Sequence, residues 1–152
     1  MSVEVKFYVQ GKRTNRLIMK MGDDTKREIK EFIDSEVLRI CDPYIPFESG
    51  QLKASGQENT IIGSGKVVWD TPYARYLYHG KLMVDPDTGS SWAKAGGRKV
   101  LTQTDLNYQG GPTRGAYWFD RAMQNGGQKE IERGIRQLCR RKSWLWKLFH
   151  GR

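Results

Sequence analysis

The sequence of 152 residues predicts a single α+β domain, because segments with two different apolar periods follow one another along the chain. Near the N-terminus apolar and polar residues alternate, which is typical of a strand. Residues 29–40 and the segment after residue 117 instead carry apolar side chains every three or four positions, as an amphipathic helix does. We therefore expect the order strand, helix, hairpin, short helix, long loop and helix, in a chain whose length suits one domain.

The first strand and the first long helix have the clearest patterns. Alternation predicts a half-buried strand over residues 3–10, which Gly11 ends. A helix of roughly 15 residues follows, with its caps at residues 23–25 and its end before Pro43. Its apolar face is formed by Ile29, Phe32, Ile33, Val37 and Ile40.

The middle of the chain predicts turns, a hairpin and a short helix. Residues 46–55 are interpreted as a turn anchored by Leu52, and residues 60–62 and 67–69 as a hairpin around the glycines of 63–66. Thr71 and Pro72 are typical of a helix start, and Gly80 of a helix end. On that helix we expect Trp69, Tyr73 and Leu77 to face the sheet, with Arg75 or Tyr76 toward a partner.

A stretch rich in Gly, Asp, Ser and Lys covers residues 81–111 and predicts a long, functional loop. Short strands are expected within it at residues 81–84 and 100–103. The chain becomes helical again from Tyr117, and the Asn-Gly-Gly sequence at residues 125–127 predicts a kink or break in that helix.

The sequence contains no pattern that indicates catalysis, so we expect no enzyme, cofactor or metal site. The segment 63–66 lacks the remaining residues of a phosphate-binding loop, and 85–89 lacks the ligands of a calcium loop. The two cysteines, Cys41 and Cys139, are too few for a disulfide framework or a four-ligand zinc site, and both fall on apolar helix faces. Synthesis in a reducing cytosol is therefore expected.

Bulk composition excludes two further classes of protein. Five Trp, seven Tyr and five Phe are too many aromatic residues for a disordered chain. No apolar run approaches the roughly 20 residues needed to cross a bilayer, and the charged Glu4 and Lys6 stand where a signal peptide needs apolar residues. We expect no membrane partner.

Positive charge gathers at the C-terminal end. The chain has a net charge of +9, and residues 129–152 hold eight basic and two acidic side chains. Such a segment suits nucleic acid, an acidic protein surface or an anionic membrane, or it is simply a solvated helix face. Residues 133, 136 and 140 share one helix face at spacings of three and four, so one hypothesis is a phosphate-binding stripe of Arg133, Arg136, Arg140 and Arg141.

Aromatic and basic residues together suggest protein interfaces. Residues 67–80 contain four large aromatics, which form either one core cluster with Trp118 and Phe119 or a contact with another chain. The segment 143–149 adds two Trp, two Leu and one Phe beside a basic cluster. We expect interfaces to involve Arg75, Tyr76, Trp92, Arg140, Arg141, Trp144, Leu145, Leu148 and Phe149.

Three segments resemble the minor capsid proteins of tailed bacteriophages and prophages. They are residues 42–52 (DPYIPFESGQL), 69–80 (WDTPYARYLYHG) and 115–123 (GAYWFDRAM), and the first is similar also to tail-completion proteins of the phage neck. The resemblance covers residues 3–140. It implies an α+β fold in which a small antiparallel sheet packs on a long helix and a C-terminal helix. The division expected is one domain over 1–142 and a basic aromatic extension over 143–152.

The resemblance also implies a role. Such proteins are structural parts of the virion, made in the cytoplasm of the bacterial host, and form neck rings that join the portal and adaptor of the head to the tail. The partners implied are other copies in a six- or twelve-fold ring, neighbouring neck, adaptor or tail proteins, and packaged DNA in passive contact. We expect residues 86–99 to be mobile in the free subunit and ordered in the particle. The alternative function is a nucleic-acid-binding module that uses the C-terminal arginine-rich helix.

Overall fold

The computed structural model describes residues 2–92 and 95–151 and confirms the α+β class. Its elements in chain order are β1 (Ser2–Val5), α1 (Lys12–Met19), α2 (Asp23–Cys41), a 3₁₀ turn (Asp42–Tyr44), α3 (Gln51–Asn59), β2 (Val67–Asp70), α4 (Ala74–His79), β3 (Lys81–Val84), β4 (Val100–Asp105), α5 (Trp118–Ala122), a π-helical turn (Met123–Gly127) and α6 (Gln128–His150).

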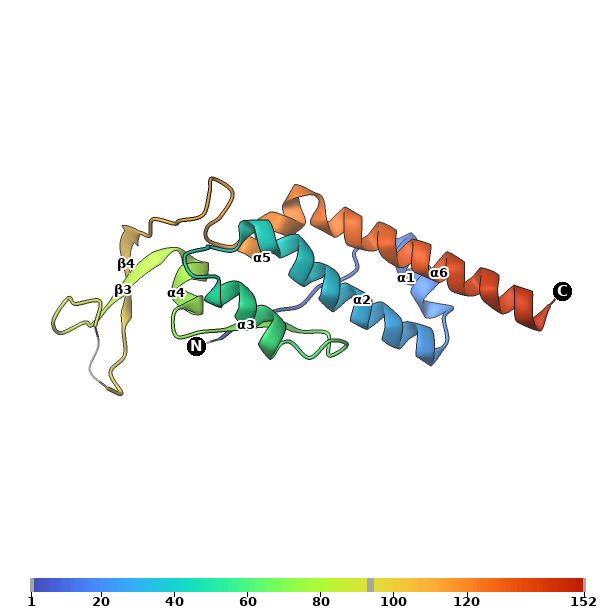
Figure 1. The fold of residues 1–152 in the computed structure, drawn as a ribbon, viewed down its shortest axis with the longest axis horizontal. Coiled ribbons are helices and arrows are strands. Elements are labelled where there is room, and N and C mark those ends of the chain that lie inside the picture. Colours follow the sequence, from blue (N-terminus) through green and yellow to red (C-terminus); the bar gives the residue numbers. More distant parts are fainter. Residues whose placement is uncertain (1, 93–94, 152) are drawn as a thin grey trace.

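The two long helices, α2 and α6, lie side by side and run in opposite directions (Figure 1). The Lys142 Nζ atom donates to Glu28 at 2.9 Å near one end of the pair, and Arg39 donates to Glu130 at 2.6 Å near the other. Their facing apolar residues form the centre of the core: Ile29, Val37 and Cys41 from α2, and Ile131, Ile135 and Cys139 from α6. The family resemblance implied a fold built on a long helix and a C-terminal helix, and the structure packs these two helices together.

The first sheet joins the N-terminal strand to β2, and the expected hairpin over residues 60–69 is wrong. Val3 pairs with Trp69 and Val5 with Val67 in an antiparallel register. Residues 60–66 form a turn held on α2, because the buried carboxylate of Asp34 accepts hydrogen bonds from the backbone N–H groups of Gly63 and Gly65 at 2.8 and 3.1 Å. The buried Trp69 ring then meets Trp118 edge to face, with centroids 5.7 Å apart.

Two short helices occupy segments that were expected to lack one. The strand expected over residues 3–10 ends at Val5, because β2 offers only four residues for pairing. Helix α1 follows Gly11 and turns the buried Thr14 and the half-buried Leu17 and Ile18 inward, and the half-buried Met21 follows its end. Helix α3 replaces the turn expected at residues 46–55; it begins after Gly50, whose φ of +81° is a left-handed conformation, and buries Leu52.

The second sheet forms an arm at one end of the molecule. β3 and β4 pair in antiparallel fashion within the predicted long loop, which confirms the strand expected at 81–84 and lengthens the one expected at 100–103. Figure 1 shows this arm at the opposite end of the long axis from the C-terminus of α6.

The helical segment after Tyr117 is interrupted where the sequence predicts it. Asn125 and Gly126 have non-helical backbone angles, with φ of +105° at Gly126. From Gln128 the helix then continues without a break to His150, through residues 143–150. The division into 1–142 and 143–152 stays a prediction, and its last residue lies outside the described part of the chain.

Candidate functional site

The residues expected at interfaces divide into two groups at opposite ends of the molecule. Arg75 and Tyr76 lie on α4 and Trp92 in the turn after β3, at the end that carries the arm. The remaining six lie on the last turns of α6: Arg140, Arg141, Trp144, Leu145, Leu148 and Phe149. The structure thus provides two candidate surfaces instead of one.

At the first end, α4 and the arm enclose an apolar groove, which we call the arm groove. It has a volume of about 490 Å³ and is lined by Glu48, Tyr73, Tyr76, Leu77, Lys81, Leu82, Met83, Ser91, Trp92, Lys99 and Leu106. The structure therefore brings Tyr76 and Trp92 together, and the Lys99 ammonium lies 5.0 Å from the centre of the Tyr76 ring. Arg75 is exposed and does not line the groove.

The expectation that Tyr73 faces the sheet is wrong, since 57% of this residue is exposed. Helix α4 begins at Ala74, three residues later than Thr71, and its inward side is formed by the buried Ala74 and the half-buried Leu77 and Tyr78. The Tyr78 ring packs edge to face on Trp118, with centroids 4.7 Å apart. The aromatic residues around α4 consequently divide between the core and the surface.

A half-buried phenol fixes the arm to α4. The Tyr108 hydroxyl donates to the backbone oxygen of Leu77 at 2.6 Å. Burial raises the pKa of Tyr108 to about 12, so the phenol stays protonated and can donate at neutral pH. The backbone N–H of Leu106 also donates to the Gly80 oxygen at 2.9 Å. Both bonds hold the base of the arm in place.

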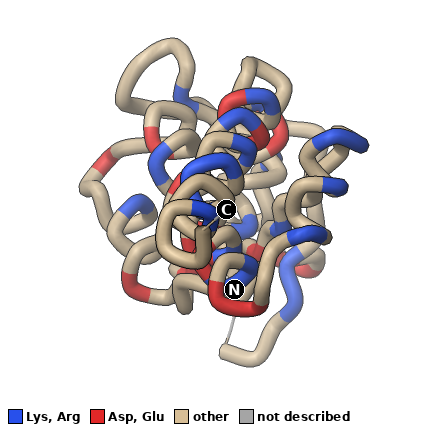
Figure 2. The backbone as a smooth tube through the Cα atoms, turned by 90° about the vertical axis from the view of Figure 1, so that its right-hand side faces the viewer, with Lys and Arg blue, Asp and Glu red and all other residues tan. Residues whose placement is uncertain are grey.

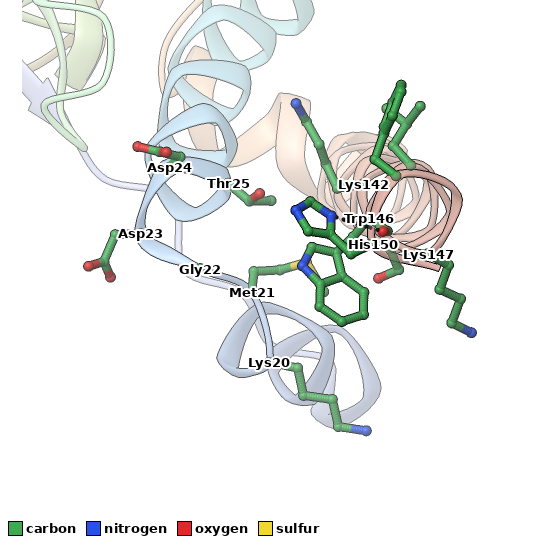
Figure 3. A pocket seen from close by; sticks show the side chains of 13 residues that line it. Lys20, Met21, Gly22, Asp23, Asp24, Thr25, Lys142, Trp146, Lys147 and His150 are labelled. Atoms are coloured by element: carbon green, nitrogen blue, oxygen red, sulfur yellow. Dashed lines mark hydrogen bonds between the residues drawn. The ribbon is translucent and has the colours of Figure 1, made fainter. Parts of the chain in front are cut away.

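At the second end, the last turns of α6 and the connection between α1 and α2 enclose a cavity of about 670 Å³, which we call the tip cavity (Figure 3). Its apolar lining comes from Met21, Leu145, Trp146 and Phe149. Trp146 stacks on His150, with ring centroids 5.3 Å apart and planes 13° from parallel. Trp144 and Leu148 do not line the cavity, so α6 exposes apolar side chains on two faces.

The apolar residues of this tip are strongly exposed. Trp144, Trp146, Leu148 and Phe149 each have 59% to 75% of their surface accessible. Since one aromatic side chain can bury about 150–250 Å², the tip exposes on the order of 500 Å² of apolar surface in total, divided between two faces of α6. A surface of this size at a chain end is typical of a protein interface.

Basic side chains surround the tip, and α1 adds to them. Figure 2, which faces the end with the C-terminus, shows Lys and Arg positions along the helix that ends there. Helix α1 contributes Lys12, Arg13 and Arg16 and no acidic residue, and it is joined to α6 where Arg136 donates to the Thr14 hydroxyl at 2.9 Å. The Arg136 side chain is therefore half-buried and bound to Thr14, whereas the side chains of Arg133, Arg140 and Arg141 are exposed.

Sequence reasoning missed α1, although a signal was present. Thr14, Leu17, Ile18 and Met21 follow the spacing of an amphipathic helix, but the face is short and the strand pattern before it was extended through Val9. Trp146, which lines the tip cavity, was also not singled out. The spacing of 142, 145, 146 and 149 on one helix face with the buried Leu138 could have indicated it.

The described residues do not form a recognisable metal site or a reactive cysteine. No group of three His, Cys, Asp or Glu side chains among them could hold a metal ion. Cys41 and Cys139 are buried free thiols, and burial raises the pKa of both, so neither forms a reactive thiolate readily. No described helix has the length and apolar character to cross a membrane.

Comparison with known proteins gives one match. A family model described as "Minor capsid protein" matches residues 5–104, which extend from the last residue of β1 through most of β4. Neither the curated proteins nor the solved structures give a match to this chain.

Proposed function

The chain belongs to the minor capsid protein family, and from this premise we propose that it is a ring-forming subunit of the neck of a tailed bacteriophage. In this role it joins the portal and adaptor of the head to the tail. Family membership makes the chain a structural component of the phage virion and confirms that it is not an enzyme. The neck position and the ring are the parts that we add.

One observation supports the proposal most directly: the subunit carries apolar surfaces at both ends of its long axis. The arm groove and the tip cavity are lined by different residues, and Figure 1 shows the arm and the C-terminal end of α6 at opposite ends of the molecule. A contact between two different surfaces leaves each copy with a free surface of both kinds, so the chain of contacts either closes into a ring or continues as a filament. A closed six- or twelve-fold ring fits the neck of a phage.

Within such a ring, we assign the basic surface of α1 and α6 to passive contact with packaged DNA or to acidic side chains of the next ring. The exposed side chains that would form it are Lys12, Arg13, Arg16, Arg133, Arg140 and Arg141. Phosphate contacts of this kind carry no sequence information and weaken steeply with salt. The site residues on the arm and the tip would meet neighbouring copies and adaptor or tail proteins.

The proposal is tested by placing the protein in the particle. Phage that lack this chain should produce DNA-filled heads and complete tails that remain separate, and electron microscopy of the purified protein should show rings with countable symmetry. Particles that join heads to tails at normal yield without the chain would overturn the neck role. Antibody labelling of intact virions would show directly where in the particle the protein lies.

A second candidate, a dedicated nucleic-acid-binding module, is favoured by one observation, the arrangement of basic helix α1 beside basic helix α6. Such a module should bind duplex DNA with micromolar or better affinity that falls steeply with salt. A neck subunit should bind free DNA weakly or not at all. Titration of labelled duplex at two salt concentrations separates the two functions.

A further inference from the structure

We propose that the acidic turn of one copy, residues Asp85–Trp92, docks in the tip cavity of the next copy, with the Trp92 indole placed against Met21, Leu145, Trp146 and Phe149. The inference rests on the proposed ring and names the contact that would build it. The occupant is a second copy of this chain.

The turn is held by hydrogen bonds between its own residues. The backbone N–H of Asp85 donates to the Ser90 oxygen at 2.8 Å, and the N–H of Gly89 donates to the Asp85 oxygen at 2.9 Å. The Asp85 carboxylate accepts from the N–H groups of Asp87 and Thr88 at 2.8 and 3.2 Å. A turn that is ordered by its own hydrogen bonds loses little conformational entropy on docking.

The end of this turn carries an aromatic residue with little to cover it. Trp92 lies at the margin of the arm groove, yet 81% of it is exposed. Its backbone N–H donates to the Ser90 hydroxyl at 3.1 Å, which fixes its position relative to the turn. Tryptophan is the residue most often found at the energetic centre of an interface, where it fills a desolvated pocket.

The tip cavity has an apolar lining that is suited to an indole ring. Figure 3 shows Met21 beside the Trp146 ring, with His150 stacked above it, so that an apolar floor is open to solvent. Trp146 and Phe149 remain 64% and 75% exposed in the isolated chain. An inserted indole would cover both.

The charges of the two surfaces are complementary. Residues 85–92 contain two Asp and no basic side chain, whereas Lys20, Lys142 and Lys147 surround the cavity. Lys142 is paired with Glu28, but Lys20 and Lys147 make no ion pair within the described part of the chain, so either can meet Asp87. The acidic residues of the lining, Asp23 and Asp24, point away from Trp146 in Figure 3.

Position and charge together exclude the simpler pairings. The turn forms one extremity of the molecule and the cavity the other, so the two cannot meet within one chain. Two tips facing each other would bring basic surfaces together, because residues 133–151 contain six Lys or Arg and no acid, and such a pairing would be repulsive. Contact between unlike ends of successive copies avoids both difficulties.

The test uses three variants of the full chain in sedimentation velocity. Trp92→Ala removes the projection, Trp146→Ala with Phe149→Ala removes the cavity floor, and Ile61→Ala is the control, since Ile61 is 77% exposed and lies in neither surface. We expect the first two to lower the self-association constant by more than about tenfold and the control to match the wild type. Circular dichroism checks that all remain folded.

A mixing experiment makes the test specific to unlike ends. The Trp92 variant retains an intact cavity and the cavity variant an intact turn, so an equimolar mixture should form one-to-one pairs although each variant alone is monomeric. Failure to form pairs, unchanged association of either variant, or a wild-type chain that stays monomeric at millimolar concentration would each overturn the inference. These outcomes leave the neck role open, because that role depends on where the protein lies in the particle.

Discussion

The side-chain carboxylate of Glu132 on α6 accepts a hydrogen bond from the backbone N–H of Gly11 at 2.8 Å and thereby joins residues 121 positions apart. Gln128 also donates to this carboxylate at 2.8 Å. Burial favours the protonated acid, but these hydrogen bonds outweigh it and hold the pKa of Glu132 below its ordinary value. The contact anchors the start of α1, and so one side of the tip cavity, to the long helix.

We therefore predict that Glu132→Gln lowers the free energy of unfolding by about 1–3 kcal/mol at pH 7, because an amide places donors opposite donors. A carboxyl with a lowered folded-state pKa contributes stability above its unfolded pKa, and the contribution is lost as the pH falls through the folded pKa. The difference between wild type and variant should thus shrink below about pH 4, the range of an ordinary glutamate. Urea denaturation of the wild type and the variant, at pH 7 and below about pH 4, measures this difference in the free energy of unfolding.

Glu130→Gln on the same helix is the matched control. Glu130 is paired with Arg39 on the surface, and exposed pairs contribute about 0–1 kcal/mol. Equal losses for the two variants at pH 7, or a loss for Glu132→Gln that does not diminish in acid, would contradict the assignment.

The late start of α4 leads to a second prediction. Leu77 is half-buried against the core, so Leu77→Ala should destabilise the protein by roughly 2 kcal/mol, the lower end of the range for truncated leucines. Tyr73→Ala should change stability by less than about 0.5 kcal/mol, because most of Tyr73 is in solvent. Melting curves of the two variants decide the matter, and an unchanged melting temperature for Leu77→Ala would refute the packing of α4.

The long helices could be predicted from the sequence because their apolar faces repeat over several turns. Helix α2 begins at Asp23, although its N-cap is Gly22 and not one of the residues 23–25, and Asn125 and Gly126 interrupt the C-terminal helical segment. The false hairpin had the same local pattern as a true one. Two distant contacts determine what residues 60–70 form instead. The Asp34 carboxylate on α2 binds the turn, and β2 pairs with β1, which lies more than 60 residues away in the sequence.

The candidate site was predictable in composition but not in arrangement. Exposed aromatic and basic side chains identify α6 as an interface element, yet the sequence does not show that α1 folds beside it. Helical spacing places Leu145, Trp146 and Phe149 on one face of α6, but it does not show that this face lines a cavity, since the α1–α2 connection supplies the other wall. Distant contacts of this kind carry no local sequence signal.

A third prediction concerns residues 86–99 of the arm, in which Ala93 and Lys94 lie outside the described residues. Arg98 is exposed beside two glycines, so brief trypsin treatment of the purified chain should cut after it. In the assembled virion, contacts with a neighbouring copy should protect the same bond. Mass spectrometry of the fragments gives the cut site, and equal protection in both states would show that assembly does not order the arm.

The last prediction concerns the tip itself. Removal of residues 143–152 should leave the domain folded, because the buried residues of α6 end at Cys139 and the tip beyond Lys142 contributes mainly exposed side chains. The same deletion removes one wall of the tip cavity and the aromatic residues expected to dominate an interface, at about 2 kcal/mol or more each. We expect an unchanged circular dichroism spectrum, a melting temperature within a few degrees of wild type, and loss of head-to-tail joining in complementation of phage that lack the chain.

Deletion of Gly151 and Arg152 alone is the control and should support normal joining. Normal particle yield without residues 143–152 would mean that the tip is a solvated extension, and the exposed aromatic residues would then need a different explanation.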